Sequence, residues 1–274
     1  MQLVEAITRL LTAGAPAAWT AAAAAYLVYF LRQDAGAERW APRLAWTAAV
    51  IHLLAIAAPG MHGICPMLLA GSVVSGLGLA VGVVHLCLEG RAKDRAIGIF
   101  PVATAALFAL AGAAADPLRR PDGQLPPGST AVHVTGAILG YAGLLLAALF
   151  GTLYLVQQKA LKEHRFGLFW ERLPSVELLD DFTTRSLAAG AAFLTATIGL
   201  GHVARHAANR VAPYFSDAKI VHADLLWLLC VGVLVARRLH RLRPNAAAVA
   251  AIVLLGIALA GPFLDRWSAA HRGV

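Results

Sequence analysis

The sequence predicts an all-α polytopic membrane protein, and three observations lead to this fold class. Of the 274 residues, 59% are apolar and only 14% are charged, whereas soluble domains carry roughly 25% charged residues. Apolar stretches long enough to cross a hydrocarbon core of ~30 Å recur between short charged or Pro/Gly-rich breaks. None of these stretches alternates polar and apolar residues, so we expect helices, not barrel strands, to satisfy the backbone hydrogen bonds in lipid.

Eight such stretches follow one another, and we expect them to form a single integral membrane domain over residues 1–274. The first follows a leader in which Glu5 accompanies Arg9. This leader lacks the positive start of a signal peptide, and no small-residue cleavage site follows, so we expect a retained span. The expected spans cover approximately residues 13–31, 44–60, 65–88, 96–115, 131–156, 187–203, 220–236 and 246–264.

The breaks between the spans differ in composition. Basic residues follow spans 1, 3 and 7, with the tightest run, RRLHRLR, at 237–243. A Gly/Pro-rich entry precedes span 3, and four prolines fill the break at 116–130. The longest break, 157–185, is expected to be a loop with an amphipathic or helical piece that lies on the membrane surface. The apolar residues expected at that surface are Leu173, Val176, Leu178 and Leu179.

The basic residues are distributed unequally between the two sides of the membrane. Fifteen of the 23 Lys and Arg residues fall in the breaks after spans 1, 3, 5 and 7, and the other eight fall on the opposite side. The positive-inside rule makes the first side cytoplasmic, so both termini are expected outside. In so apolar a chain, the net charge of +8 is explained by the basic residues that set this orientation in the membrane. We therefore expect no nucleic-acid partner.

Six of the ten histidines fall on the expected outer side, and this asymmetry is the most informative feature of the sequence. His133 opens span 5, His202 and His206 lie four residues apart at the end of span 6, and His222 begins span 7. Ionisable groups at span ends are costly, so each one suggests a function. For each histidine alone, a hydrogen-bonded helix end is an equally good explanation. The remaining two are His62 and His271.

Three kinds of site compete for these imidazoles. A haem held by two axial histidines needs one imidazole on each face of the ring, from separate helices, and an apolar or aromatic pocket. A zinc or copper site needs three or four ligands at short spacing, and acids and cysteines are sparse on this side. A proton-coupled transporter is typically built from internal repeats, and the sequence has no clear one. Haem is favoured, and the absence of a CxxCH motif predicts that it is not covalently attached.

Other polar or small residues within the spans also suggest roles. His52 lies in the middle of span 2, where no water can satisfy it, so it is expected to face a helix, a cavity or a ligand. His85, near the cytoplasmic end of span 3, is expected to be structural. Two glycine pairs spaced by four residues predict close helix packing, with room for a flat ligand as the alternative. These pairs are Gly78 with Gly82 and Gly136 with Gly140.

Several segments resemble one family of membrane proteins. The stretch AVHVTGAILGYAGLLLAALFGTLYLVQQKAL at 131–161 resembles the cytochrome c assembly membrane proteins (CcsA-like), in which an outer histidine precedes a Gly-Tyr-Ala step. Here these positions are His133 and Tyr141. The stretch SDAKIVHADLLWLL at 216–229 is similar to the family's Asp-Pro-Lys element and its tryptophan-bearing span, with Trp227 matching and alanine in place of proline. The likeness covers most of the chain from about residue 44 onward.

Two departures make the chain more similar to the HemX-like branch of this family. The outer segment RHAANRVAPYFSDAK has no tryptophan, whereas haem-exporting members carry a tryptophan-rich segment there. Near the end of the last span, Asp265 stands where those members carry a second outer histidine. The usual pair of axial histidines is therefore incomplete in this chain.

The resemblance implies a multi-pass protein of the bacterial inner (plasma) membrane that handles haem during cytochrome c maturation and is not itself an enzyme. It implies a non-covalent, transiently held b-type haem with His133 as an axial ligand. We infer His222 or His202 as the opposite ligand, and His52 as a midplane ligand on a transit route. Trp227 and Tyr214 are further candidates, as aromatic walls of the haem pocket. Arg205 is a candidate for the residue that binds a haem propionate.

The expected partners are haem, the lipid bilayer, and apocytochrome c or a second cytochrome c assembly membrane protein. Two other functions stay open at this point. One is a HemX-like membrane regulator or scaffold of tetrapyrrole biosynthesis without a bound cofactor. The other is a small-solute transporter.

Overall fold

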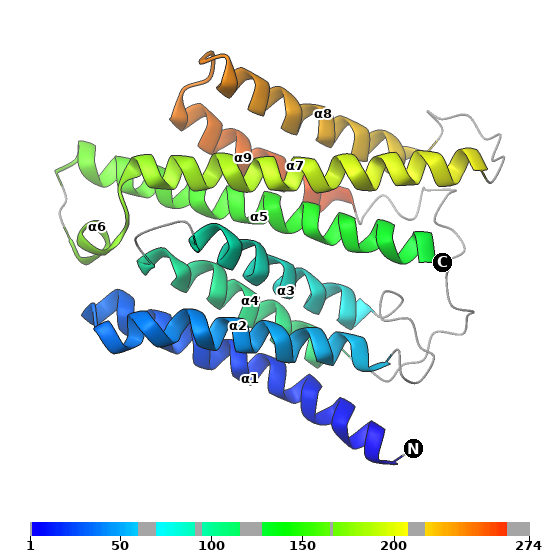
Figure 1. Ribbon diagram of the computed structural model, residues 1–274. Coiled ribbons are helices and arrows are strands. Elements are labelled where there is room, and N and C mark those ends of the chain that lie inside the picture. The colour runs from blue at the N-terminus through cyan, green and yellow to red at the C-terminus, as the bar shows by residue number, and fades with distance from the viewer. Residues whose placement is uncertain are drawn as a thin grey trace. The chain divides into compact units, whose positions relative to one another are not determined.

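The computed structural model describes residues 2–59, 70–90, 95–115, 128–164, 167–207 and 217–261, and within these ranges it contains helices and short connections but no strand (Figure 1). The chain forms two compact units. Unit 1 comprises Met1–Pro126 and His164–Pro174, and unit 2 comprises Pro127–Glu163 and Ser175–Val274. Each unit is described by itself below.

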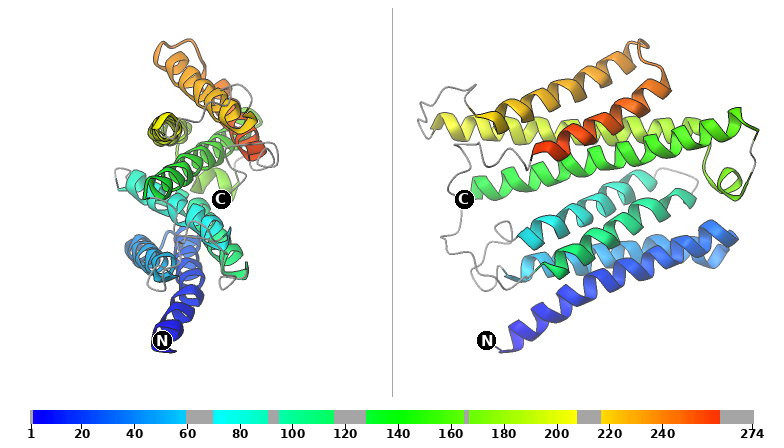
Figure 2. Two further views of the ribbon diagram at one scale, coloured as in Figure 1. Left: turned by 90° about the vertical axis from the view of Figure 1, so that its right-hand side faces the viewer. Right: turned by 180° about the vertical axis from the view of Figure 1, so that it is seen from behind.

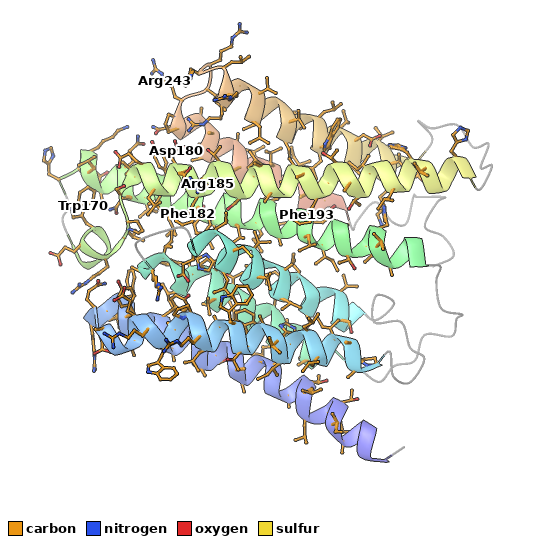
Figure 3. All side chains as sticks on the ribbon, viewed as in Figure 1. Trp170, Asp180, Phe182, Arg185, Phe193 and Arg243 are labelled. Atoms are coloured by element: carbon orange, nitrogen blue, oxygen red, sulfur yellow. The ribbon has the colours of Figure 1, made fainter. Side chains whose placement is uncertain are left out.

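The described residues of unit 1 form four long helices, which lie side by side and run in alternating directions (Figures 1 and 2). A short 3₁₀ turn, η3, precedes the fourth helix, and the short helix α6, with Trp170 labelled in Figure 3, also belongs to this unit. Asp34 begins the second helix by accepting a hydrogen bond from the N–H of Ala37 at 2.7 Å, as an N-cap residue does. The elements are α1 (Gln2–Arg32), α2 (Ala35–Ala57), α3 (Ala70–Glu89), η3 (Ala96–Gly98), α4 (Ile99–Ala114) and α6 (Leu168–Arg172).

The core of unit 1 is built from two large aromatic residues on α1 and small residues on its neighbours. Trp19 and Tyr26 are fully buried, and each ring lies against a glycine. A Cβ atom on Gly82 would lie 2.2 Å from the Trp19 ring, and one on Gly98 would lie 2.1 Å from the Tyr26 ring. A Cβ atom on Gly78 would lie 2.7 Å from an atom of α4, so the packing role expected for Gly78 and Gly82 is confirmed.

Unit 2 contains α5 (Gly128–Lys162), α7 (Val176–Ala207), α8 (Ala218–Arg238) and α9 (Pro244–Ala260). Helices α5 and α7 run antiparallel and pack through small residues. A Cβ atom on Gly143 would lie 2.5 Å from the backbone of Gly190, and one on Gly136 would lie 2.3 Å from the hydroxyl of Thr197. Gly140 likewise packs against Leu194, so the second glycine pair is also a packing device.

A substitution at the α5–α7 contact tests this packing. Gly143→Ala is expected to lower the free energy of unfolding by about 1–3 kcal/mol, because the added methyl group meets backbone atoms that cannot turn away. The matched control is Gly232→Ala on the exposed side of α8, where no atom lies within 4 Å of a Cβ. Thermal unfolding in detergent measures both variants. Equal melting temperatures would show that the two helices do not pack as described.

The end of unit 2 where α5 meets α7 and α8 meets α9 carries the basic connections, and we call it the basic end. Arg237 forms an ion pair with Asp180 of α7, and its Nη1 donates to the carbonyl of Leu242 at 3.2 Å. Arg243 lies at this same end (Figure 3). The Tyr154 hydroxyl and the Gln158 side chain both donate to Oδ1 of Asn245, at 2.8 and 2.5 Å, and so join α5 to α9.

The chain is an all-α membrane protein with several membrane-length helices. Seven helical segments of the described residues are long and apolar enough to cross a membrane, and α9, with 17 residues, is a shorter apolar helix. The predicted all-α polytopic fold is confirmed. The eighth span, the outward termini and the single domain over 1–274 stay predictions.

The predicted surface loop at 157–185 is wrong at both of its ends. Helix α5 continues to Lys162, and α7 already begins at Val176 after the helix-starting pair Pro174 and Ser175. The carbonyl of Ser175 accepts the N–H groups of Leu178 and Leu179 at 3.1 Å, which closes the first turn. Leu179, in the first turn of α7, is fully buried, and Leu173, ahead of this helix, is 6% exposed, so neither lies on the surface of the protein.

Candidate functional site

Four histidines lie at the end of unit 2 opposite the basic end, which we call the histidine end. It is formed by the start of α5, the end of α7, the start of α8 and the end of α9 (Figure 1). These four are His133 on α5, His202 and His206 on α7, and His222 on α8. Of the other sequence candidates, Tyr214, His62 and His271 lie outside the described residues. The backbone of Arg205 is described in α7, but its side chain is not.

The ring of His133 is held against α7 by a backbone hydrogen bond. Its Nδ1 lies 2.9 Å from the carbonyl oxygen of Thr197, and its Cε1 lies 3.1 Å from the position that a Cβ on Gly201 would take. A carbonyl only accepts, so Nδ1 carries the proton and Nε2 carries the lone pair. Histidines that bind metals are oriented in this way, with the second ring nitrogen donating to a carbonyl or carboxylate.

His222 is held by α9 in a similar way, through its other nitrogen. Its Nε2 lies 2.9 Å from the carbonyl oxygen of Ile257, so Nε2 donates and Nδ1 carries the lone pair. A Cβ atom on Gly261 would lie 3.3 Å from Cε1 of His222 and 3.2 Å from the hydroxyl of Tyr141. Gly261 thus provides the space in which Tyr141 of α5 and His222 of α8 approach each other.

His202 pairs with an acidic residue on the neighbouring helix. Its Nε2 lies 3.3 Å from Oδ1 of Asp224, and the two side chains are 40% and 20% exposed. A carboxylate that accepts a ring N–H raises the basicity of the other nitrogen. Trp227 is partly exposed and donates its indole N–H to the hydroxyl of Thr195 at 2.7 Å, which fixes its ring between α8 and α7. His206 is exposed.

The arrangement brings imidazoles from three helices to one end, but each ring is bonded to a different partner. Within the ranges that the structure describes, no three His, Cys, Asp or Glu side chains come close enough to hold a metal ion together. A haem iron needs fewer protein ligands, because the porphyrin supplies four, and one or two axial histidines hold it. The imidazoles at the histidine end are of the chemical type that haem iron takes as axial ligands.

The side chain of His52 in unit 1 is buried, with 1% of its surface exposed, and it forms two hydrogen bonds. The indole N–H of Trp19 donates to its Nδ1 at 2.8 Å, and its Nε2 lies 2.5 Å from the hydroxyl of Ser75. The expectation that His52 faces another helix or a cavity is confirmed. Trp19 and Ser75 were not among the residues expected at this site. One signal in the sequence points to Ser75, because Ser75, Gly82 and Glu89 recur every seven residues and so share one face of α3.

His85 lies close to a carboxylate on its own helix. It is fully buried, and its Nε2 lies 3.7 Å from Oε1 of Glu89, one turn further along α3. The hydroxyl of Tyr26 donates to Oε2 of the same glutamate at 2.7 Å. Tyr26 lies seven residues after Trp19 on α1, so one face of that helix provides donors to two buried ionisable groups.

The fold and these sites define a multi-pass helical membrane protein whose histidines gather at one end of a helical unit. A model of the cytochrome c assembly protein family matches residues 66–271, so the chain belongs to the cytochrome c assembly protein family. The predicted resemblance is confirmed.

Two curated relatives place the chain near the HemX-like proteins. It is 36% identical over 69 residues to Protein HemX of Brevibacillus brevis, which covers 25% of each chain. It is 28% identical over 127 residues to Protein HemX of Bacillus subtilis (strain 168), which covers 46% of each chain. The chain thus matches a quarter and just under half of the length of these relatives. No solved structure matches the chain.

Proposed function

We propose that this protein binds haem as cargo at the histidine end of unit 2 and handles it during the maturation of c-type cytochromes. The observation that carries the proposal is the hydrogen bond from Nδ1 of His133 to the carbonyl of Thr197. This bond fixes the ring and leaves Nε2 as the nitrogen with a lone pair, which is what an axial ligand of haem iron requires. Family membership supports the same function.

The residues of this chain bind and orient the haem, and we propose no bond change for them. His133 is the first axial ligand, and His202 or His222 is the second. Trp227 forms an aromatic wall, and Tyr214 and Arg205 stay predictions for a second wall and a propionate partner. Bound haem supplies the iron porphyrin that c-type cytochromes receive. We propose that apocytochrome c or a second cytochrome c assembly membrane protein receives it at the bacterial inner membrane.

Purification tests this function. Protein extracted in mild detergent from haem-replete cells is expected to carry a non-covalent haem, seen as a Soret band that stays with the protein during gel filtration. Acid–acetone extraction is expected to remove the haem, because the chain has no CxxCH motif for covalent attachment.

A colourless protein that also fails to bind added haem would contradict the proposal. It would favour the second candidate, a membrane regulator or scaffold of tetrapyrrole biosynthesis without a cofactor. The similarity to two proteins named HemX supports this candidate.

The second axial ligand can be found by single substitutions. His202→Ala and His222→Ala are compared in haem-loaded protein by absorbance and electron paramagnetic resonance. We expect one of the two to convert a six-coordinate low-spin haem to a five-coordinate high-spin haem, because that variant lacks the sixth ligand. The exposed His206→Ala is the matched control, since it changes a histidine at the same end. Low-spin spectra in both variants would contradict ligation by either residue.

A further inference from the structure

Unit 1 contains a cavity of about 310 Å³ that lies beside His52. Residues of α1, α2, α3 and α4 line it, and most of these residues are small and apolar. This volume is at the lower end of the range for pockets that bind small molecules. The polar residues of the lining are Thr8, Arg9, Thr12, His52, Ser72 and Ser75.

The hydrogen bond from Trp19 decides which nitrogen of His52 carries the proton. An indole N–H can only donate, so Nδ1 of His52 must accept, and the neutral ring carries its proton on Nε2. Trp19 is fully buried and its ring presses against Gly82, where a Cβ atom would lie 2.2 Å away. The indole therefore cannot turn away from His52 without a change in the core.

The same proton determines what Ser75 can do. Nε2–H of His52 donates to the hydroxyl oxygen of Ser75 at 2.5 Å, so that oxygen accepts and the hydroxyl keeps its own proton to donate. A metal ligand needs a lone pair at Nε2, and the tautomer that Trp19 selects has none there. The pair of His52 and Ser75 thus fits a hydrogen-bond donor to a ligand, and it does not fit an axial ligand of haem iron.

The rest of the lining favours the same kind of ligand. It contains hydroxyl groups and the cation Arg9, and the described residues that line the cavity include no carboxylate. The apolar walls of the cavity consist of small residues, which let the helices approach closely. They include Ala13, Ala55, Gly71, Ala109, Gly112 and Ala113. An apolar molecule can enter such a pocket from the lipid, and a polar atom that it buries there needs a donor.

We propose that this cavity binds an apolar membrane molecule that ends in a hydrogen-bond-accepting oxygen. The hydroxyl of Ser75 donates to this oxygen, and the hydrogen bonds from Trp19 to His52 and from His52 to Ser75 hold the hydroxyl in place. The shared chemistry is an accepting oxygen on an apolar body. A quinone ring and a long-chain carboxylate both have it. This role replaces the predicted role of His52 as a midplane haem ligand, and it does not depend on haem binding in unit 2.

Thermal shift on the full-length protein in detergent tests the proposal with two probes, duroquinone and laurate. We expect at least one probe to raise the melting temperature saturably, and the probe that does so identifies the source of the oxygen. His52→Gln is expected to keep this shift, because an amide can accept from Trp19 and donate to Ser75. His52→Met, which could still ligate iron, is expected to weaken binding by at least about tenfold because it cannot donate.

A second pair of variants tests the cavity itself without changing a polar group. Ala55→Leu fills the cavity and is expected to abolish the shift, whereas Ala57→Leu on the exposed side of α2 is expected to keep it. Gel filtration and the melting temperature without probe show that each variant is folded.

Three results would overturn the proposal. The first is that neither probe raises the melting temperature of the wild type. The second is that His52→Met or Ala55→Leu leaves the rise in melting temperature unchanged. The third is that His52→Gln changes the haem spectrum.

Discussion

His133→Ala is expected to remove most of the haem from the purified protein, with a loss of affinity of at least about tenfold, as expected when a metal site loses a ligand. The physical reason is that alanine takes away the Nε2 lone pair that the bond to Thr197 holds in position. The variant also loses that hydrogen bond, so its free energy of unfolding is expected to fall by about 1 kcal/mol. The measurement is the ratio of Soret absorbance to protein, with added haem titrated back.

The control for this prediction is His206→Ala, which removes an exposed histidine from the same end of unit 2. It is expected to retain haem as the wild type does. If His133→Ala and His206→Ala lose equal amounts of haem, the loss reflects surface histidines in general. If neither loses haem, the iron is held elsewhere.

Tyr26→Phe is expected to destabilise unit 1 by about 1–3 kcal/mol, because it leaves a buried carboxylate oxygen without its donor. Tyr26 is fully buried, and its hydroxyl donates to Oε2 of Glu89, which is 4% exposed. The ring itself is retained, so its contact with Gly98 is unchanged by the substitution. Thermal or denaturant unfolding in detergent measures the effect.

A double-mutant cycle separates this hydrogen bond from general damage to the core. The variants are Tyr26→Phe, Glu89→Leu and the combination of both. We expect the double variant to lose less stability than the sum of the single variants, because it leaves neither partner of the Tyr26–Glu89 hydrogen bond without the other. Additive losses, or a Tyr26→Phe protein as stable as the wild type, would show that the bond contributes nothing.

Hydropathy was sufficient to predict seven membrane-length helices and to bring His133, His202, His206 and His222 to one end of them. Both follow from the order of apolar stretches along the chain, since successive helices alternate in direction. The sequence reasoning failed where a helix continues beyond its apolar core. Polar residues of α7 near Asp180 lie inside that helix, because the ion pair with Arg237 and the start at Ser175 stabilise it.

The partners of the buried polar residues could not be predicted, because hydropathy does not give the rotation of a helix about its axis. His52 was correctly expected to need a partner, but Trp19 reaches it from another helix only because Gly82 leaves room for the indole ring. Asp224 follows His222 by two residues in the sequence, yet it pairs with His202 of α7. These pairings set the tautomers, and the two proposals rest on the tautomers, with iron bound by His133 and a hydrogen bond donated by His52.

The most direct test of the central claim is imidazole rescue of His133→Gly. The claim is that Nε2 of His133 binds haem iron at the histidine end of unit 2. The haem-reconstituted glycine variant is expected to show an altered Soret band and weakened haem binding, and added imidazole is expected to restore the wild-type spectrum by occupying the vacated position. A variant whose spectrum equals that of the wild type before imidazole is added, or does not respond to imidazole, would contradict the claim.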